Sequence, residues 1–269
     1  MTVNFQWANG TLMNLGALPG GSNCSEPFWV NDIGEIVGTS ENGLVDPLAN
    51  VNQTRAVLWQ DGQIMDLGSF GGYQNAAQGI NNRGQISGFS LNTTPDPYSL
   101  NEFFFFGSSN GTQTRAFIWQ NGQMQDLGTL GTGNDAAAFG INEHGQIVGY
   151  GYTSAVPNPV TGLPPIDPFF WENGQITDIG SLGGAFGLPS FLNNRGQVVG
   201  VSSIASNPAA CFREQDPDCH PFLWNQGRLL VLPISQATTA RRSMPICGST
   251  VWLLIWALWR VTVSAWRLV

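Results

Sequence analysis

Residues 115–149 read RAFIWQNGQMQDLGTLGTGNDAAAFGINEHGQIVG, and the chain repeats this stretch with small changes. Five tryptophans mark the copies, at spacings of 52, 60, 52 and 53 residues: Trp7, Trp59, Trp119, Trp171 and Trp224. A period of this length is typical of arrays built from supersecondary units. The repeated stretch therefore decides the fold.

Each copy contains two hairpin signals. A Gly stands three residues after each Trp, and Asn or Asp precedes it in four of the five copies. Such a pair between apolar runs indicates a type I′ turn, so 116–119 and 124–127 should pair as antiparallel strands. A Gly-rich link leads to a second hairpin, whose turns end in Gly and read NDIG (31–34), NNRG (81–84), NEHG (142–145) and NNRG (193–196).

Two hairpins in series predict a four-stranded antiparallel meander. Its strands read as apolar runs, which are typical of strands buried on both faces. Sheets stacked face to face around an axis form a β-propeller. We therefore expect an all-β, propeller-like domain over 1–240, with the Trp residues in its core. A flat β-solenoid is the alternative, disfavoured by the hairpin turns. The sequence contains four complete units, at 5–40, 55–90, 115–151 and 168–202, and a partial fifth unit at 221–240.

These motifs resemble the HAF repeat family, named for a His-Ala-Phe triplet. The resemblance runs from about residue 5 to 233 and lies in 55–72, 115–131, 169–184 and the NxxGQ[IV]xG stretches. The triplet itself stands altered, as Arg55-Ala56-Val57, Arg115-Ala116-Phe117, Pro168-Phe169-Phe170 and His220-Pro221-Phe222. The resemblance implies a secreted, bacterial, β-rich repeat protein, extracellular or at the cell surface. It transfers no site residue, and the chain shows no signal peptide of its own.

Charge limits the partners. The formal net charge is −8 and all ten basic residues are Arg, which argues against a nucleic-acid partner, because phosphate binding needs a basic surface. Residues 241–269 carry four Arg and no acid and abandon the repeat. Their longest uncharged apolar run, 246–259, is shorter than the roughly 20 residues of a membrane helix. We interpret this tail as a divergent or frame-shifted end, and expect a monomer that does not engage membranes.

Segments of variable length separate the units, at 41–54, 91–114, 152–167 and 203–220. In a closed ring they would emerge on one face, where binding loops are usually found; neutral drift of surface loops is the other interpretation. Segment 91–114 contains Phe103, Phe104, Phe105 and Phe106, which would either pack across the ring or contact a partner.

Two cysteines, Cys211 and Cys219, lie in one of these segments and could form a loop disulfide in an oxidising compartment; a solvated acidic loop is the alternative. Its acids, Glu214, Asp216 and Asp218, could also hold Ca²⁺, although their spacing matches no EF-hand, and we expect no metal. Cys24 and Cys247 are expected to stay unpaired.

An acidic position recurs seven residues after the Trp, as Asp66, Asp126 and Asp178, with Asn14 and Val231 in the outer copies. Such carboxylates could line a central channel as an acidic ring. The structural alternative is an Asx turn, in which each accepts a backbone N–H from the Gly-rich link. His144 and His220 replace other residue types in the repeat and do not indicate catalysis.

No nucleophile elbow, metal-binding motif or phosphate-binding loop occurs, so no catalytic residue and no cofactor is predicted. We expect a non-enzymatic extracellular scaffold that binds an unknown ligand or protein through loops on one face. One alternative is a hydrolase or lyase of glycan or peptide with acidic residues at the propeller axis. Another is a truncated product without a function of its own.

Overall fold

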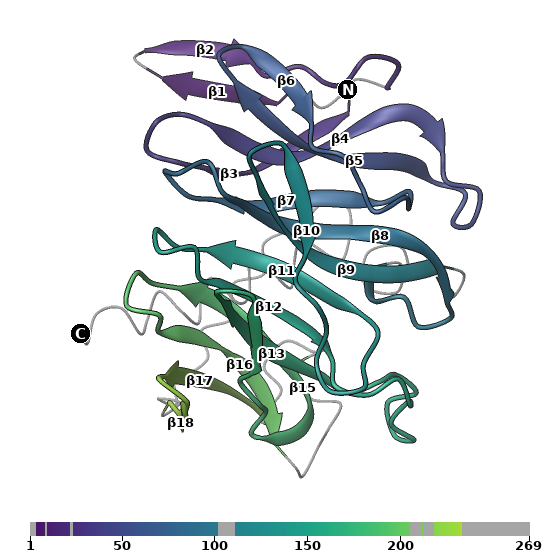
Figure 1. The fold of residues 1–269 in the computed structure, drawn as a ribbon, viewed down its shortest axis with the longest axis vertical. Helices are drawn as coiled ribbons and strands as arrows, with labels where there is room; N and C mark the ends of the chain where they lie inside the picture. The colour runs from purple at the N-terminus through teal and green to yellow at the C-terminus, as the bar shows by residue number, and fades with distance from the viewer. Residues whose placement is uncertain are drawn as a thin grey trace, which may run out of the picture.

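The structure, a computed structural model, describes residues 4–8, 10–21, 24–101, 111–204, 211 and 218–232. Phe103–Phe106, Cys247 and the tail 241–269 lie outside the described residues. Among the described strands every pair but one is antiparallel. The strands form one two-stranded hairpin, two four-stranded sheets and one eight-stranded sheet. The eight-stranded sheet consists of two four-stranded antiparallel sheets that the parallel pair joins. The all-β, propeller-like fold is confirmed. Figure 1 shows the sheets following one another along the long axis, from β1–β2 at the top to β17–β18 at the bottom.

The strands group into the sheets in chain order. The N-terminal hairpin is β1 (Phe5–Ala8) and β2 (Thr11–Asn14). Sheet 1 is β3 (Ser25–Val30), β4 (Ile36–Val45), β5 (Asn52–Gln60) and β6 (Gln63–Asp66). Sheet 2 is β7 (Asn75–Ile80), β8 (Ile86–Asp96), β9 (Gly111–Gln120) and β10 (Gln123–Asp126).

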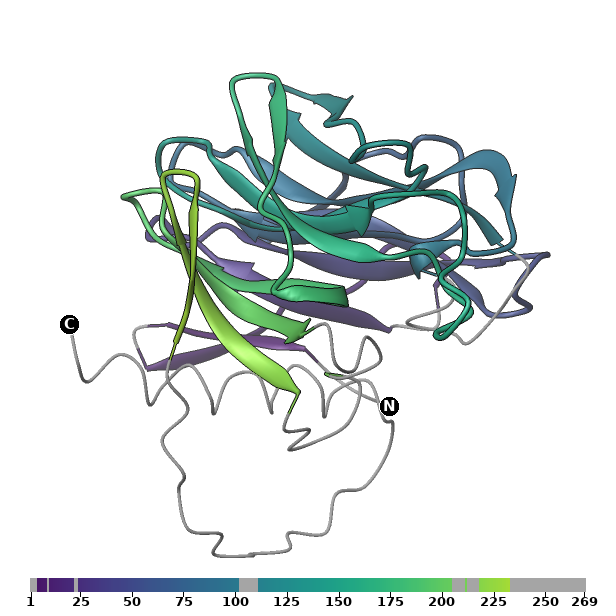
Figure 2. The ribbon, with the colours of Figure 1, turned by 90° about the horizontal axis from the view of Figure 1, so that it is seen from below.

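Two further sheets complete the array. Sheet 3 is β11 (Ala136–Ile141), β12 (Ile147–Tyr152), β13 (Ile166–Glu172) and β14 (Gln175–Asp178). Sheet 4 is β15 (Gly183–Leu192), β16 (Val198–Ile204), β17 (Cys219–Asn225) and β18 (Arg228–Val231). Ile166 and Phe186 form a parallel bridge between sheets 3 and 4. Figure 2, which looks along the stack, shows successive sheets turned relative to one another.

The two hairpins of one sequence unit belong to different sheets, which corrects the expected meander. The Trp hairpin β5–β6 pairs with the Asn-x-x-Gly hairpin that precedes it, β3–β4, and the Gly-rich link 67–74 crosses to sheet 2. The intervening segments extend strands within a sheet, because β8 continues to Asp96 and β9 starts at Gly111. The incomplete sheet is therefore β1–β2 at the N-terminal end, and 221–231 completes sheet 4.

A Gly in each second strand allows neighbouring strands to approach closely. A Cβ on Gly149 would lie 2.1 Å from the carbonyl oxygen of Ala137 and 2.5 Å from the ring of Phe169. Gly88 meets Ala76 and Phe117 in the same way, and Gly200 meets Leu188 and Phe222. The last Gly of the NxxGQ[IV]xG pattern is thus required because an aromatic ring from the third strand covers it.

The first strand of each sheet faces the middle of the array, which is apolar. One buried cluster contains Ala76 of β7, Ala137 of β11 and Phe186 of β15, and Phe28 of β3 packs against it. The middle therefore contains hydrophobic side chains instead of a ring of acids.

The repeated tryptophans differ in burial according to their neighbours. Trp59 is 3% exposed, and Trp171 and Trp224 are each 7% exposed. Trp7 is 69% exposed, because its hairpin has only two strands and β1 has no neighbour on its other edge among the described residues. The prediction that these residues are core is therefore correct for Trp59, Trp171 and Trp224. It holds in part for Trp119, which is half-buried, and is wrong for Trp7.

Candidate functional site: a groove between sheets 2 and 3

The Asn-x-x-Gly turns are held by the side chain of their Asn. In sheet 2 the Asn81 Oδ1 accepts the backbone N–H groups of Arg83 and Gln85 at 3.0 and 3.1 Å, and Asn81 Nδ2 donates to Gln85 Oε1 at 2.8 Å. Gln85 Nε2 in turn donates to Gln120 Oε1, the residue after the Trp of β9. This chain of amides ties the first hairpin of the sheet to the second.

The same Asn side chains also join one sheet to the next. Asn31 Nδ2 donates to the carbonyl oxygen of Asn81 at 3.1 Å, Asn81 Nδ2 to Asn142 at 2.9 Å, and Asn142 Nδ2 to Asn193 at 2.9 Å. We call this series the turn ladder. It places all four turns side by side on one face of the array, and the segments between second and third strands therefore lie on the opposite face.

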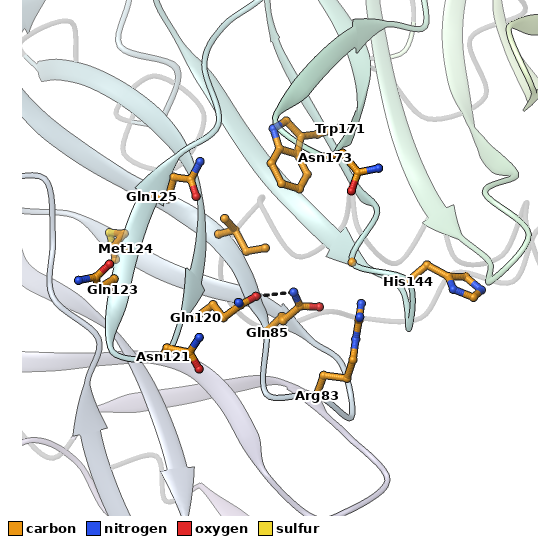
Figure 3. Close-up of a pocket in the computed structure, with 12 residues that line it drawn as sticks. Arg83, Gln85, Gln120, Asn121, Gln123, Met124, Gln125, His144, Trp171 and Asn173 are labelled. Carbon is orange, nitrogen blue, oxygen red and sulfur yellow. Dashed lines mark hydrogen bonds between the residues drawn. The ribbon is translucent and has the colours of Figure 1, made fainter.

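A groove of about 880 Å³ opens on the turn face between sheets 2 and 3. Its apolar part is Ile118, Met124 and Trp171. Its polar part is mostly side-chain amides, contributed by Gln85, Gln120, Asn121, Gln123, Gln125 and Asn173 (Figure 3). The β9–β10 hairpin forms one wall, and sheet 3 forms the other.

Basic groups also line the groove. Arg83 comes from the β7–β8 turn and His144 from the β11–β12 turn (Figure 3). No Asp or Glu is among the lining residues, although the chain carries a net charge of −8. Arg83 takes part in neither of the ion pairs found in the described part of the chain. The groove lining therefore offers a carboxylate a cation and no acid. The carboxylate of Glu143, which lies beside the lining, accepts the backbone N–H of Asn82 at 3.2 Å.

The acids that the sequence singled out lie elsewhere. Asp66, Asp126 and Asp178 each end the outer strand of a different sheet, where Oδ1 accepts a backbone N–H two residues later, at 2.7 or 2.8 Å. The structure thus has them in the Asx turn and does not bring them together. Arg55 pairs with Asp66 at 3.0 Å, and Arg115 with Asp126 at 2.8 Å.

Sheet 3 replaces that Arg with an acid. Asp167 stands where Arg55 and Arg115 stand in sheets 1 and 2, so it faces Asp178 without a cation. Burial, and secondarily the charge of Asp178, raises the pKa of Asp167 to about 7. A carboxyl with this pKa could transfer protons near neutral pH. It does not line the groove.

A buried acid cluster on the opposite face was missed by the sequence analysis. Asp135 is completely buried and accepts the backbone N–H of Leu100 at 2.6 Å. Burial is the main cause that raises its pKa to about 8. Asp96 accepts the backbone N–H of Tyr98 at 2.7 Å and a bond from Asn134 Nδ2.

Sheet 1 contains a related arrangement, which suggests that these acids are structural. Asp46 accepts the backbone N–H of Leu48 at 2.8 Å, and its other oxygen accepts Gln74 Nε2 at 3.2 Å. In both sheets a buried Asp fastens the segment after the second strand to the link before the next sheet. The signal in the sequence was a polar residue just before the first strand of the next sheet, Gln74 or Asp135.

The remaining predicted residues can be placed as follows. A disulfide bond joins Cys211 and Cys219, with their Cα atoms 4.9 Å apart. Cys24 is free and exposed. Within the described ranges, no three His, Cys, Asp or Glu side chains come together in a way that could hold a metal ion. No helix in that part of the chain is long and apolar enough to cross a membrane.

The fold and the groove define an all-β repeat protein of the propeller type. No family model matches the chain, and no curated protein matches it. Among solved structures, it is similar to the β-propeller domain of the Trilobed protease from Pyrococcus furiosus, with 12% identity, a TM-score of 0.45, and coverage of 79% of this chain and 52% of the other. It is also similar to the Pyrococcus horikoshii acylaminoacyl peptidase, with 13% identity, a TM-score of 0.46, and coverage of 78% and 27%.

These comparisons correct the expected function. The sequence analysis predicted a non-enzymatic scaffold, whereas the matching solved structures belong to peptide-cleaving enzymes. The chain spans about half and about a quarter of the lengths of those two proteins. At such low similarity no residue role is transferred from them.

Proposed function

We propose that this chain serves the hydrolysis of peptides, and that the groove between sheets 2 and 3 binds the peptide substrate. The observation that carries the proposal is the lining of the groove: side-chain amides from both walls, an apolar floor and no acid.

Side-chain amides suit a peptide ligand. Each Gln or Asn side chain offers both a donor and an acceptor, which is what the N–H and C=O groups of an extended peptide need. Gln123 and Gln125 lie two residues apart on β10, so they point to the same side of the strand. The outer edge of β10 is also unpaired in sheet 2, and an extended peptide can add to such an edge.

The apolar and basic parts give the groove its selectivity. Trp171 and Ile118, at the apolar base of the groove, provide a surface for an apolar peptide side chain. Arg83 provides positive charge for a carboxylate, either the peptide's C-terminus or an acidic side chain, and the His144 ring offers a further hydrogen-bonding group. We therefore expect a preference for peptides with a free C-terminal carboxylate over the same peptides with an amidated end.

The proposal is tested by calorimetric titration with unstructured casein-derived peptides, and with cello-oligosaccharides as the glycan probe. Gln125→Ala combined with Asn173→Gly, which tolerates the positive φ of that turn position, removes two exposed amides from opposite walls and should weaken peptide binding about tenfold, or ~1.4 kcal/mol. Gln63→Ala is the matched control, because Gln63 starts β6 of sheet 1 as Gln123 starts β10. Cleavage of the peptides is followed by mass spectrometry.

Peptide binding that only the groove variant weakens supports the proposal. If only the oligosaccharide binds, the groove is a glycan-binding site and the glycan alternative is favoured. An equal loss in Gln63→Ala, or no saturable peptide binding, overturns the proposal.

The relationship to HAF repeats and the bacterial, extracellular location that it implies remain proposals. The NxxGQ[IV]xG stretches support the relationship, although the His-Ala-Phe triplet itself is altered. Fractionation of the source cells, with detection of the protein by antibody, tests the location; recovery from the cytosol alone would contradict it.

A further inference from the structure

The turn ladder stops at sheet 1. The carbonyl oxygen of Asn81 accepts two hydrogen bonds, one from the N–H of Gly84 within its own turn and one from Asn31 Nδ2 of the preceding sheet, both at 3.1 Å. Its counterpart in sheet 1, the carbonyl oxygen of Asn31, accepts the N–H of Gly34 at 3.1 Å. Sheet 1 thus presents an acceptor at the place where each later sheet receives a donor.

A second row of bonds ends in the same way. The backbone N–H of Asp32 donates to Asn82 Oδ1 at 2.8 Å, and that of Glu143 to Asn194 Oδ1 at 3.0 Å. In each case the turn of one sheet donates to a side-chain oxygen of the next sheet. In sheet 1 the matching oxygen is in the carboxylate of Asp32. A turn packed before sheet 1 would donate its own backbone N–H to this carboxylate.

The apolar surface beside this end is uncovered. Val30 is 56% exposed, whereas Ile80, which ends the first strand of sheet 2 as Val30 ends that of sheet 1, is 2% exposed. Ile80 is buried because Val37 and Leu58 of sheet 1 pack against it. Trp29, next to Val30, is 50% exposed.

The hairpin β1–β2 shows which kind of strand could pair with the other edge of β1. In sheet 1 the Trp59 position pairs with Ile64 on one side and with Ile36 on the other. Trp7 pairs with Leu12 in β2, and no strand of the described residues pairs with its other side. The second strands of sheets 2, 3 and 4 place an aliphatic residue opposite their Trp, in identical register: Ile86, Ile147 and Val198.

We propose that β1, Val30 and the turn 31–34 form a docking site for one β-hairpin of the repeat type, supplied by a partner chain. The hairpin must carry an Asn-x-x-Gly turn followed by Gln and an aliphatic residue. Its Asn side chain donates to the carbonyl oxygen of Asn31, its next backbone N–H reaches Asp32, and its aliphatic residue lies opposite Trp7. The four such hairpins among the described residues of this chain are already built into complete sheets, so the hairpin comes from a different protein.

The probe is a synthetic peptide with the sequence of residues 136–152, AAAFGINEHGQIVGYGY, titrated into the full chain. Saturable binding should shift tryptophan emission to the blue and raise the Tm. The emission change should shrink in Trp7→Phe while the Tm shift remains. Peptides with Asn142→Asp, which lacks the donor, or Ile147→Glu, which puts a charge opposite Trp7, should bind at least about tenfold more weakly.

A short hairpin is marginally stable alone in water, so a second form of the experiment joins the same segment to the N-terminus through a Gly-Ser linker. Hydrogen exchange of the amides of Phe5–Ala8 should then slow, and the Asn142→Asp fusion should show less protection. Equal behaviour of the native and altered hairpins, or neither a Tm shift from the peptide nor protection in the fusion, overturns the proposal.

Discussion

The side-chain amide of Asn81 donates to the carbonyl oxygen of Asn142 across 2.9 Å, and so connects the turn of sheet 2 to the turn of sheet 3. The same side chain holds its own turn through Gln85. A single residue therefore stabilises both a hairpin and the boundary between two sheets.

Replacement of this amide should show its double role. In Asn81→Asp the remaining oxygen can still accept the turn N–H groups, but the donor to Asn142 is lost, and both Asn142 and Gln85 lose a partner. We expect a loss of about 1–3 kcal/mol in the free energy of unfolding, measured by urea denaturation. Asn194→Asp is the control, because its Oδ1 acceptor for Glu143 is kept; an equal loss there would contradict the role of the Asn81 donor.

Equivalent tryptophans should differ in their effect on stability. Trp59→Ala removes a buried side chain and should lower the free energy of unfolding by about 3–5 kcal/mol. Trp7→Ala removes an exposed one and should change it by less than about 1 kcal/mol. Thermal or urea unfolding of both variants provides the measurement, and similar losses would mean that Trp7 is covered in solution.

The Gly under each aromatic ring cannot carry a side chain without movement. Gly149→Ala would bring a methyl group against the carbonyl of Ala137 and the ring of Phe169, and should cost at least about 1–3 kcal/mol. Gly140→Ala is the control, because its nearest contact would be an ordinary 3.6 Å to Val148. If both variants unfold at the same urea concentration, strand spacing here is looser than the structure has it.

The carboxyl of Asp167 should make stability depend on pH. Its pKa is raised from 3.8 to about 7 in the folded chain, so folding favours the protonated form. The stabilisation is complete below the unfolded pKa and is lost as the pH rises from about 4 to about 7. Asp167→Asn should therefore flatten the decline in stability between about pH 4 and pH 7, as followed by urea unfolding.

Asp135 contributes to the same trend, since its pKa is raised to about 8. The Asp167→Asn variant should thus keep part of the decline, and further replacement of Asp135 by Asn should remove more of it. A second replacement, Asp167→Arg, should restore the pairing seen between Arg55 and Asp66 and stabilise the chain at neutral pH. Unchanged pH profiles in both Asp167 variants would show that this carboxyl titrates normally.

The hairpins could be predicted because their chemistry is local. Asp61, Asn121 and Asn173 have positive φ angles of 51–53°, as the type I′ turn requires, and a Gly with positive φ follows each. Sheet membership could not be predicted in the same way. A repeating sequence looks alike wherever its unit is taken to begin, and only the long-range pairing of β4 with β5 or β8 with β9 decides the boundary.

The candidate groove was not predictable either. Gln125 and Asn173 look like ordinary polar residues of an outer strand and a turn, and the surface they share arises only when sheets 2 and 3 are placed side by side. The recurring acids drew attention in the sequence, yet Asp66 and Asp126 are engaged with their own turns and with Arg. Recurrence in a repeat marks what each copy needs in order to fold.

The Gly-rich link that crosses from the outer strand of one sheet to the inner strand of the next has a consequence for how such arrays evolve. A duplicated unit would contribute its first hairpin to one sheet and its second hairpin to the next sheet. Its strands would therefore pair with strands of both neighbouring units. Growth or loss of one unit would then leave the same kinds of surface at the two ends, and length could change without the invention of new interfaces.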